Sequence, residues 1–240
     1  MMRRIERENT GNLRAGQDLV VAGNPGLAGA AVIAERFHSH LKTWFSGEYL
    51  EELEAAGQKA EGALEPVLAE LASEITEAEP IGEGGVLKAI WNLTGAYETG
   101  VRFALRQIPV TQATVEICER FELNPYRLYS SSCALLASEN GGRLAEKLKA
   151  RGIEAAVIGA VRKGIAREMI VQEGQGFLEH PLLAIHGSHY LIRADVHNHG
   201  MQFIFDFQFL YLINKPGSIF RSRQLLLKCV KSETIVNTLV

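Results

Sequence analysis

Three short clusters of glycine, serine and glutamate have the composition of a phosphate-binding or carboxylate-bearing site. The first cluster is Gly23, Gly26 and Gly29, which follow the apolar run Asp18–Ala22 and open an alanine-rich segment. A glycine turn between a strand and a helix can present backbone N–H groups and the positive helix end to an anion. The spacing is GxxGxxG, so neither a GxGxxG dinucleotide fingerprint nor a P-loop is indicated. A tight turn with close helix packing, the usual role of glycine, explains the same residues without a ligand.

The second cluster is an acidic double-glycine turn formed by Glu83, Gly84 and Gly85. It precedes a segment with apolar residues at helical spacing, so we expect it to open a helix. Glu83 could offer its carboxylate to water, a metal ion or a substrate. A negative charge beside a helix N-terminus is also stabilising in itself, and the two roles are left open here.

The third cluster is Ser130, Ser131 and Ser132, immediately before an apolar run that we predict to be a buried strand at 133–137. The hydroxyls could contact a phosphate, or they could bond the backbone of their own loop, as serines before strands commonly do. Cys133 opens the apolar run and is expected to be a buried, unreactive thiol.

A separate histidine pair near the C-terminus suggests metal binding. His197 and His199 are spaced HxH, which on a strand would place both rings on one face, with His186, His189 and Asp195 nearby in sequence. Histidine pairs of this kind occur in metal hydrolases, but hydrolase barrels need far more chain than these 240 residues provide. The pair is retained as a metal-site prediction, and an accidental match is the alternative because motifs this short recur by chance.

The segments that would position these clusters alternate between strands and helices. Between 48 and 79 the chain is acidic, with leucines at three-to-four spacing, which predicts amphipathic helices with a solvated face. The expected strands are 18–22, 101–105, 133–137 and 153–161, and the expected helices begin near 27, 85, 111 and 143, with Gly152 as a C-cap. This alternation predicts a layered α/β domain.

Composition excludes several classes of protein. The chain is 47% hydrophobic and 22% charged with a net charge of −3, so no basic field favours nucleic acid or an anionic membrane. The longest apolar run is too short to cross a bilayer, and the three cysteines have no CxxC spacing. We expect a cytoplasmic chain with reduced thiols. Residues 1–15 are predicted to be a leader, and residues 184–240 an atypical, poorly packed tail rich in histidine and phenylalanine.

Several segments together resemble the C-terminal domain of the aminoimidazole-ribonucleotide (AIR) synthase-related, PurM-like superfamily. The resemblance is closest to the hydrogenase-maturation (HypE-like) branch and covers residues 16–183. It rests on the glycines at 23, 26 and 29, on EGGVLKAIWNL at 83–93, on the segment at 108–137, on GIEAAVIGAV at 152–161 and on FLEHP at 177–181. The fold it implies is a three-layer α/β/α domain with a mixed sheet. The cofactor-binding residues it implies are Gly23, Gly26, Gly29, Glu83, Gly84, Gly85, Ser130 and Ser131.

The resemblance also has consequences for function. The family's ATP and magnesium are held by an N-terminal domain that this chain lacks, so we expect a truncated binding or dimerisation module with no cofactor and no complete catalytic machinery of its own. Where the family has an acid and a hydroxyl before its double glycine, this chain has Pro80 and Gly82, and Ser132 replaces a family glycine. The alternative is one half of a split ATP-dependent synthase or carbamoyl dehydratase. The expected partners are a second copy or a separate ATP-binding domain.

Overall fold

The computed structural model describes residues 12–60, 62–172, 174–180, 191–192 and 203–204. The chain divides into two compact units, Met1–Cys118 with Asn124–Pro181, and Glu119–Leu123 with Leu182–Val240. In the second unit, strand β8 (Leu191–Ile192) pairs with the antiparallel strand β9 (Phe203–Ile204). All further description concerns the first unit, which holds the three clusters.

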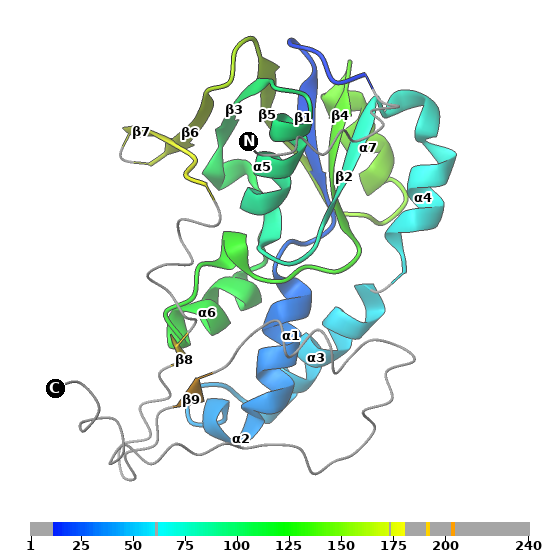
Figure 1. The fold of residues 1–240 in the computed structure, drawn as a ribbon. Helices are drawn as coiled ribbons and strands as arrows, with labels where there is room; N and C mark the ends of the chain where they lie inside the picture. Colours follow the sequence, from blue (N-terminus) through cyan, green and yellow to red (C-terminus); the bar gives the residue numbers. More distant parts are fainter. Residues whose placement is uncertain (1–11, 61, 173, 181–190, 193–202, 205–240) are drawn as a thin grey trace, which may run out of the picture. The chain divides into compact units, whose positions relative to one another are not determined.

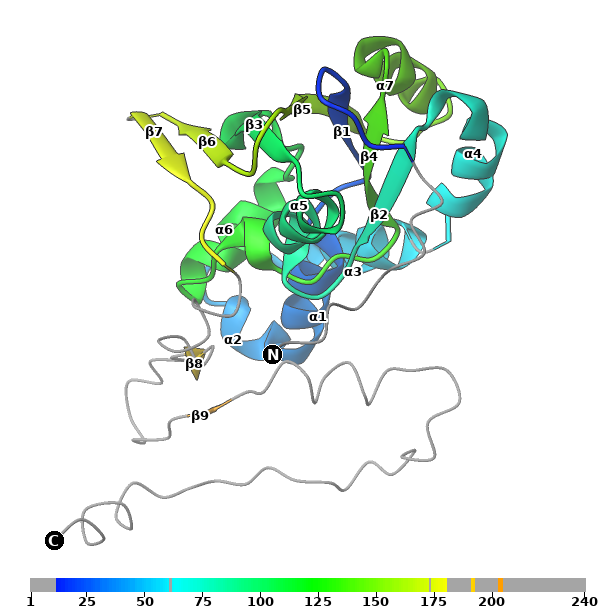
Figure 2. The same ribbon diagram turned by 45° about the horizontal axis from the view of Figure 1, so that its top comes forward.

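A seven-stranded mixed sheet forms the centre of the first unit (Figures 1 and 2). Its strands in sheet order are β2 (Glu77–Ile81), β4 (Cys133–Ser138), β1 (Asp18–Ala22), β5 (Ala155–Arg162), β3 (Gly100–Ala104), β6 (Arg167–Val171) and β7 (Gly174–Phe177). Neighbouring strands are antiparallel except β3 and β6, which are parallel. The predicted α/β fold with a mixed sheet is confirmed.

Helices lie on both faces of this sheet. The helices are α1 (Leu27–Arg36), α2 (His38–Leu41), α3 (Gly47–Ala60), α4 (Leu64–Glu70), α5 (Gly85–Ala96), α6 (Gln112–Arg120) and α7 (Gly141–Lys149), with short 3-10 turns at Ala72–Glu74, Leu105–Gln107 and Pro125–Arg127. α5 packs on one face, and α4 and α7 pack on the other. The sheet with a helical layer on each side is the three-layer arrangement that the resemblance implied.

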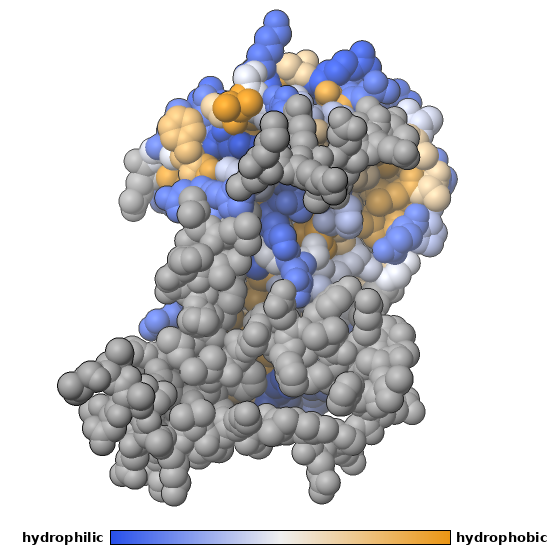
Figure 3. Space-filling model, viewed as in Figure 1, coloured by the Kyte–Doolittle hydropathy of each residue, from blue (hydrophilic) through white to orange (hydrophobic). Residues whose placement is uncertain are grey.

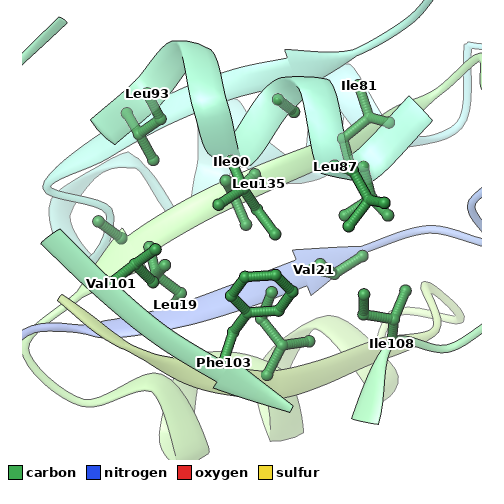
Figure 4. Close-up of a cluster of buried hydrophobic side chains, with 14 of the residues drawn as sticks. Leu19, Val21, Ile81, Leu87, Ile90, Leu93, Val101, Phe103, Ile108 and Leu135 are labelled. Atoms are coloured by element: carbon green, nitrogen blue, oxygen red, sulfur yellow. The ribbon is translucent and has the colours of Figure 1, made fainter. Parts of the chain in front are cut away.

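The alternation of side chains along β1 shows how one strand serves two cores. Leu19 and Val21 point toward α5, where Ile90, Phe103 and other buried side chains surround them (Figure 4). Val20 and Ala22 point the other way, into a cluster with residues of α4 and α7. Because successive side chains of a strand face opposite sides of the sheet, a strand covered on both faces reads as a continuous apolar run.

The acidic stretch at 48–79 contains one error of prediction. Its last residues form the edge strand β2 instead of a helix. Outside this stretch, the sequence analysis also did not predict the strands β6 and β7. Along β2, Glu79 is buried whereas Ala78 and Pro80 are exposed, so the strand lacks the pattern of apolar residues on its inner face that would predict it. Proline is tolerated there because an edge strand needs ladder bonds on one side only.

The packed unit extends upstream to Leu13, which is buried in the α5-side core although it lies in the segment predicted to be a leader. Gln17 ties this segment down, since its side-chain oxygen accepts the N–H of Arg14 at 2.8 Å and its amide nitrogen donates to Glu139 at 2.9 Å.

Candidate functional site

Strand pairing brings the three predicted clusters together at one end of the sheet. β1 and β2 both run antiparallel to β4, with Ala22 opposite Ala134 and Ile81 opposite Cys133. The loops that leave β1 and β2 therefore emerge beside the loop that enters β4. We call residues 23–26, 82–85 and 130–132 the sheet-end loops.

Ser130 joins all three sheet-end loops. Its hydroxyl accepts the backbone N–H of Gly26 at 2.8 Å and donates to the carbonyl of Leu128 at 3.2 Å. Its own N–H donates to the carbonyl of Gly82 at 3.4 Å. The residue is almost fully buried, so these bonds replace water for groups that would otherwise be left unpaired. For Ser130, the structure therefore supports the structural alternative for the serine cluster, in which the hydroxyl bonds the loop backbone.

The glycines of the first cluster donate all three of their amides to protein acceptors. The N–H of Gly23 donates to Glu154 O at 2.8 Å, that of Gly26 to Ser130, and that of Gly29 to Tyr129 O at 3.1 Å. A Cβ at Gly29 would lie 2.6 Å from Leu128 Cγ, closer than side chains tolerate. These contacts give the cluster a packing role, and cofactor binding by it stays a prediction.

The double glycine opens α5, as predicted, and the strand that leads into it is β2. Gly84 and Gly85 have φ angles of +80° and +64°, a left-handed conformation that favours glycine. A Cβ at Gly85 would lie 2.4 Å from the carbonyl oxygen of Tyr126, so this position also needs glycine for space. Glu83 is partly exposed beside the N-terminus of α5 and is the carboxylate that the sheet-end loops provide.

The remaining two serines behave differently from Ser130. Ser132, which replaces a family glycine, has φ of +49°, in the left-handed region that favours glycine, and its hydroxyl accepts the N–H of Gly62 at 2.7 Å. The hydroxyl oxygen of Ser131 is buried and has no hydrogen-bond partner among the described residues. A buried polar atom without a partner is uncommon and calls for an explanation.

No activated nucleophile accompanies the described sheet-end loops. Burial raises the pKa of the Cys133 thiol to about 12, against a smaller opposing effect of a hydrogen bond from the Asn24 backbone. The thiol is thus protonated at neutral pH, and the thiolate is the reactive form. Cys118, the other described cysteine, is also buried and its pKa is likewise raised to about 12.

The histidine pair lies outside the described residues, so the structure gives no geometry for His197 and His199. Within the described residues, no group of three or more potential ligands is arranged to hold a metal ion. The same part of the chain contains no helix with the length and apolar character needed to span a bilayer.

Comparison with known proteins identifies the fold. The family model for the AIR synthase related protein, C-terminal domain, matches residues 14–171. The structure of E. coli HypE superposes with a TM-score of 0.59 at 21% identity, over 70% of this chain and 51% of that one. A HypE–HypF complex gives 0.55 at 17%, over 71% and 55%, and HypE in complex with ATP gives 0.52 at 15%, over 70% and 52%. The chain therefore spans about half the length of these proteins. No curated protein matches it at the sequence level.

Proposed function

Since this chain belongs to the AIR synthase-related family by its match to that family's C-terminal domain, we propose that it acts as a binding module without complete catalytic machinery of its own. The observation that carries the proposal is the chemistry of the sheet-end loops. The glycine amides and the Ser130 hydroxyl are used to hold the loops together, and Cys133 is protonated. Glu83 is left as a lone carboxylate, whereas acid–base chemistry needs positioned groups with matched pKa values.

A second candidate, half of a split ATP-dependent enzyme, is favoured by Ser131. Its unpartnered hydroxyl lies in the loop beside the N-terminus of α5, where an anion would also be favoured. The HypE structures in complex with ATP and with HypF are precedents in proteins of the same fold for nucleotide binding and for assembly with another chain. In the split-enzyme hypothesis, Ser131 and Glu83 form one wall of a site, and a separate ATP-binding domain supplies the contacts to ATP and magnesium.

Calorimetry with ATP and magnesium tests the proposal. The purified 240-residue chain should give no binding heat alone, because its loops offer no free phosphate cradle. Tight binding by the chain alone would contradict the module proposal. The titration is then repeated after addition of a separately produced N-terminal ATP-binding domain of the kind that the family resemblance implies. Nucleotide binding that depends on both components would favour the split enzyme, and its absence would favour the module.

A pair of matched variants locates any nucleotide effect. Ser131 and Thr99 each carry a buried hydroxyl without a partner among the described residues, and only Ser131 lies in the sheet-end loops. Removing an unsatisfied hydroxyl should cost the fold little, so Ser131→Ala and Thr99→Val should both remain folded. In the split enzyme, Ser131→Ala should weaken nucleotide binding about tenfold, the cost of one lost hydrogen bond, and Thr99→Val should leave it unchanged.

The metal-binding alternative concerns the tail alone. Zinc titration of the chain and of a His197→Ala, His199→Ala double variant should show one site lost in the variant. Equal zinc binding by both would dismiss the histidine pair as a ligand set.

A further inference from the structure

The two edges of the seven-stranded sheet differ in their protection against pairing with another strand. Free edges expose unpaired N–H and C=O groups, and proteins commonly block them with charge or proline. The β2 edge carries Glu77, Glu79 and Pro80. The β7 edge has the sequence Gly-Gln-Gly-Phe, with no charge and no proline. Among the described residues, one edge is protected against pairing with another strand, and the other is open to it.

The hydrogen bonds of β6 fix which groups of β7 face outward. The N–H of Val101 in β3 donates to Ala166 O at 2.9 Å, and the N–H of Leu178 donates to Arg167 O at 2.9 Å. Alternate residues of β6 therefore serve β3 and β7. Leu178, Gly176 and Gly174 must turn their backbone groups inward to β6, so those of Gln175 and Phe177 point to the free edge.

Apolar side chains accompany this free edge. Phe177 is 64% exposed and Ile170 is 36% exposed, and strand pairing puts both on the face of the sheet opposite α5. Arg102 and Glu168, 3.8 Å apart, lie in the same cross-strand row as Phe177. Hydrophobic residues reach the surface around the β6–β7 corner (Figure 3). Exposed aromatic residues beside unpaired backbone groups are features of strand-pairing sites.

We propose that β7 pairs with β7 of a second copy of this chain, antiparallel, with the two-fold axis at Gly176. The outward-facing residues Gln175 and Phe177 lie on either side of Gly176, so Gln175 of one copy lies opposite Phe177 of the other. This register makes four backbone hydrogen bonds. Gly176 meets itself at the close, non-hydrogen-bonded position, where its open surroundings leave room. An uncharged strand brings no like charges together across the axis, which favours self-pairing over a partner chosen by charge.

The dimer should be weak and in fast exchange. A four-residue strand pair with a few flanking side chains is smaller than the roughly 1,200 Å² that stable complexes bury. Self-association should therefore rise with protein concentration and be sensitive to single changes at the edge.

Sedimentation velocity over a concentration series tests the dimer, using the full chain. Gln175→Pro removes an outward N–H and leaves the inward bonds to β6 in place, and Gln175→Ala keeps that N–H as the matched control. The proline variant should raise the dimer dissociation constant at least tenfold, and the alanine variant should change it less than threefold. Equal association of all three proteins, or no association at any soluble concentration, would overturn the proposal.

Hydrogen exchange keeps the proposal testable if Gln175→Pro disturbs folding. In the unaltered chain, the amides of Gln175 and Phe177 should become protected as concentration rises, while those of Gly174 and Gly176 stay protected throughout. Protection of Gln175 and Phe177 that is independent of concentration would mean that the edge is covered within one chain, and would refute the second-copy assignment. Neither experiment depends on the function of the sheet-end loops.

Discussion

At the scale of single residues, the candidate site is held together by groups whose first task is structural. Ser130 bridges three loops, and the glycines allow backbone segments to approach more closely than any side chain would permit. Residues that resemble a family's binding motif can therefore be needed for the loop geometry before any ligand is present. Substitutions can separate the effect of backbone conformation from that of close contact, because the glycines differ in their φ angles and in the atoms that a Cβ would meet.

Ser130→Ala should destabilise the fold by about 1–3 kcal/mol, since it leaves the buried N–H of Gly26 without its acceptor. Urea unfolding followed by circular dichroism measures this change. Ser131→Ala is the control, because its hydroxyl makes no bond with the described residues, and it should lie within about 0.5 kcal/mol of the unaltered chain. Equal effects of the two changes would show that the Ser130 bridge contributes nothing.

Gly85→Ala should cost more stability than Gly152→Ala. Both glycines have positive φ, at +64° and +79°, so both variants incur a backbone penalty of about 1–2 kcal/mol. A Cβ at Gly85 would also meet Tyr126 O at 2.4 Å, whereas nothing lies within 4 Å of one at Gly152. Thermal unfolding should rank Gly85→Ala clearly below Gly152→Ala. The reverse order would argue against the close contact between α5 and the Pro125–Arg127 turn.

Cys118 and Cys133 should resist thiol reagents in the folded chain. Burial raises the pKa of both thiols to about 12, so the thiolate is scarce at pH 8 and the sulfurs are sheltered. Mass spectrometry after brief alkylation, with and without urea, should show modification of these two residues in urea only. Rapid labelling of Cys133 in the native chain would contradict its proposed inertness.

At the scale of elements, α7 shows how sequence and packing combine to fix a helix on the sheet. Asn140 caps its start by accepting the N–H of Arg143 at 3.0 Å, and Leu144 and Leu148 are fully buried against β1 and β4 residues. Glu74, in the turn before β2, bonds Lys147 from outside the helix and lies 3.7 Å from Arg143. The helix is thus anchored by one apolar face and one charged side.

Glu74 should make stability depend on pH in the acid range. Its pKa is lowered from 4.5, chiefly by the hydrogen bond from Lys147. The folded-state pKa lies below the unfolded value, so the contribution is complete above about 4.5 and is lost as pH falls through the folded value. Glu74→Gln should lower the unfolding midpoint slightly at pH 7, and the difference from the unaltered chain should vanish in strong acid.

Glu146→Gln serves as the control for Glu74, because it removes an exposed carboxylate of the same helix that has no ion pair among the described residues. Its unfolding midpoint should follow that of the unaltered chain at every pH. A pH-independent effect of Glu74→Gln would contradict the linkage.

At the scale of the whole molecule, the first unit has the core of an independent domain. α5 covers one face of the sheet, α4 and α7 cover part of the other, and both clusters are built from residues of that unit. We expect a fragment of residues 1–183 to fold alone and unfold cooperatively, as judged by a single urea transition seen by two probes. Loss of cooperative unfolding in the fragment would place residues after 183 in the core and refute the predicted boundary.

The sequence by itself determined the elements whose patterns are local. β1, β4 and β5 appear as apolar runs, and α5 and α7 as helical periodicities. The helix expected to begin near 111 is α6, and the Thr111 hydroxyl before it accepts the N–H of Thr114 at 3.2 Å. The conformation of Gly84, Gly85 and Gly152 could also be predicted, because positive φ is the commonest reason for glycine at a helix end.

The tertiary structure alone decided which of these residues meet and what they do there. β2 was mistaken for helix because its pairing with β4, not its own composition, makes it a strand. The antiparallel pairing of β4 with β1 brings together the loops at 23–26 and 130–132, so that the Ser130 hydroxyl becomes the acceptor for Gly26, 104 residues away in the chain. The unprotected edge at β7 follows likewise from strand order. Pairing across a sheet depends on contacts distant in sequence, which no local pattern encodes.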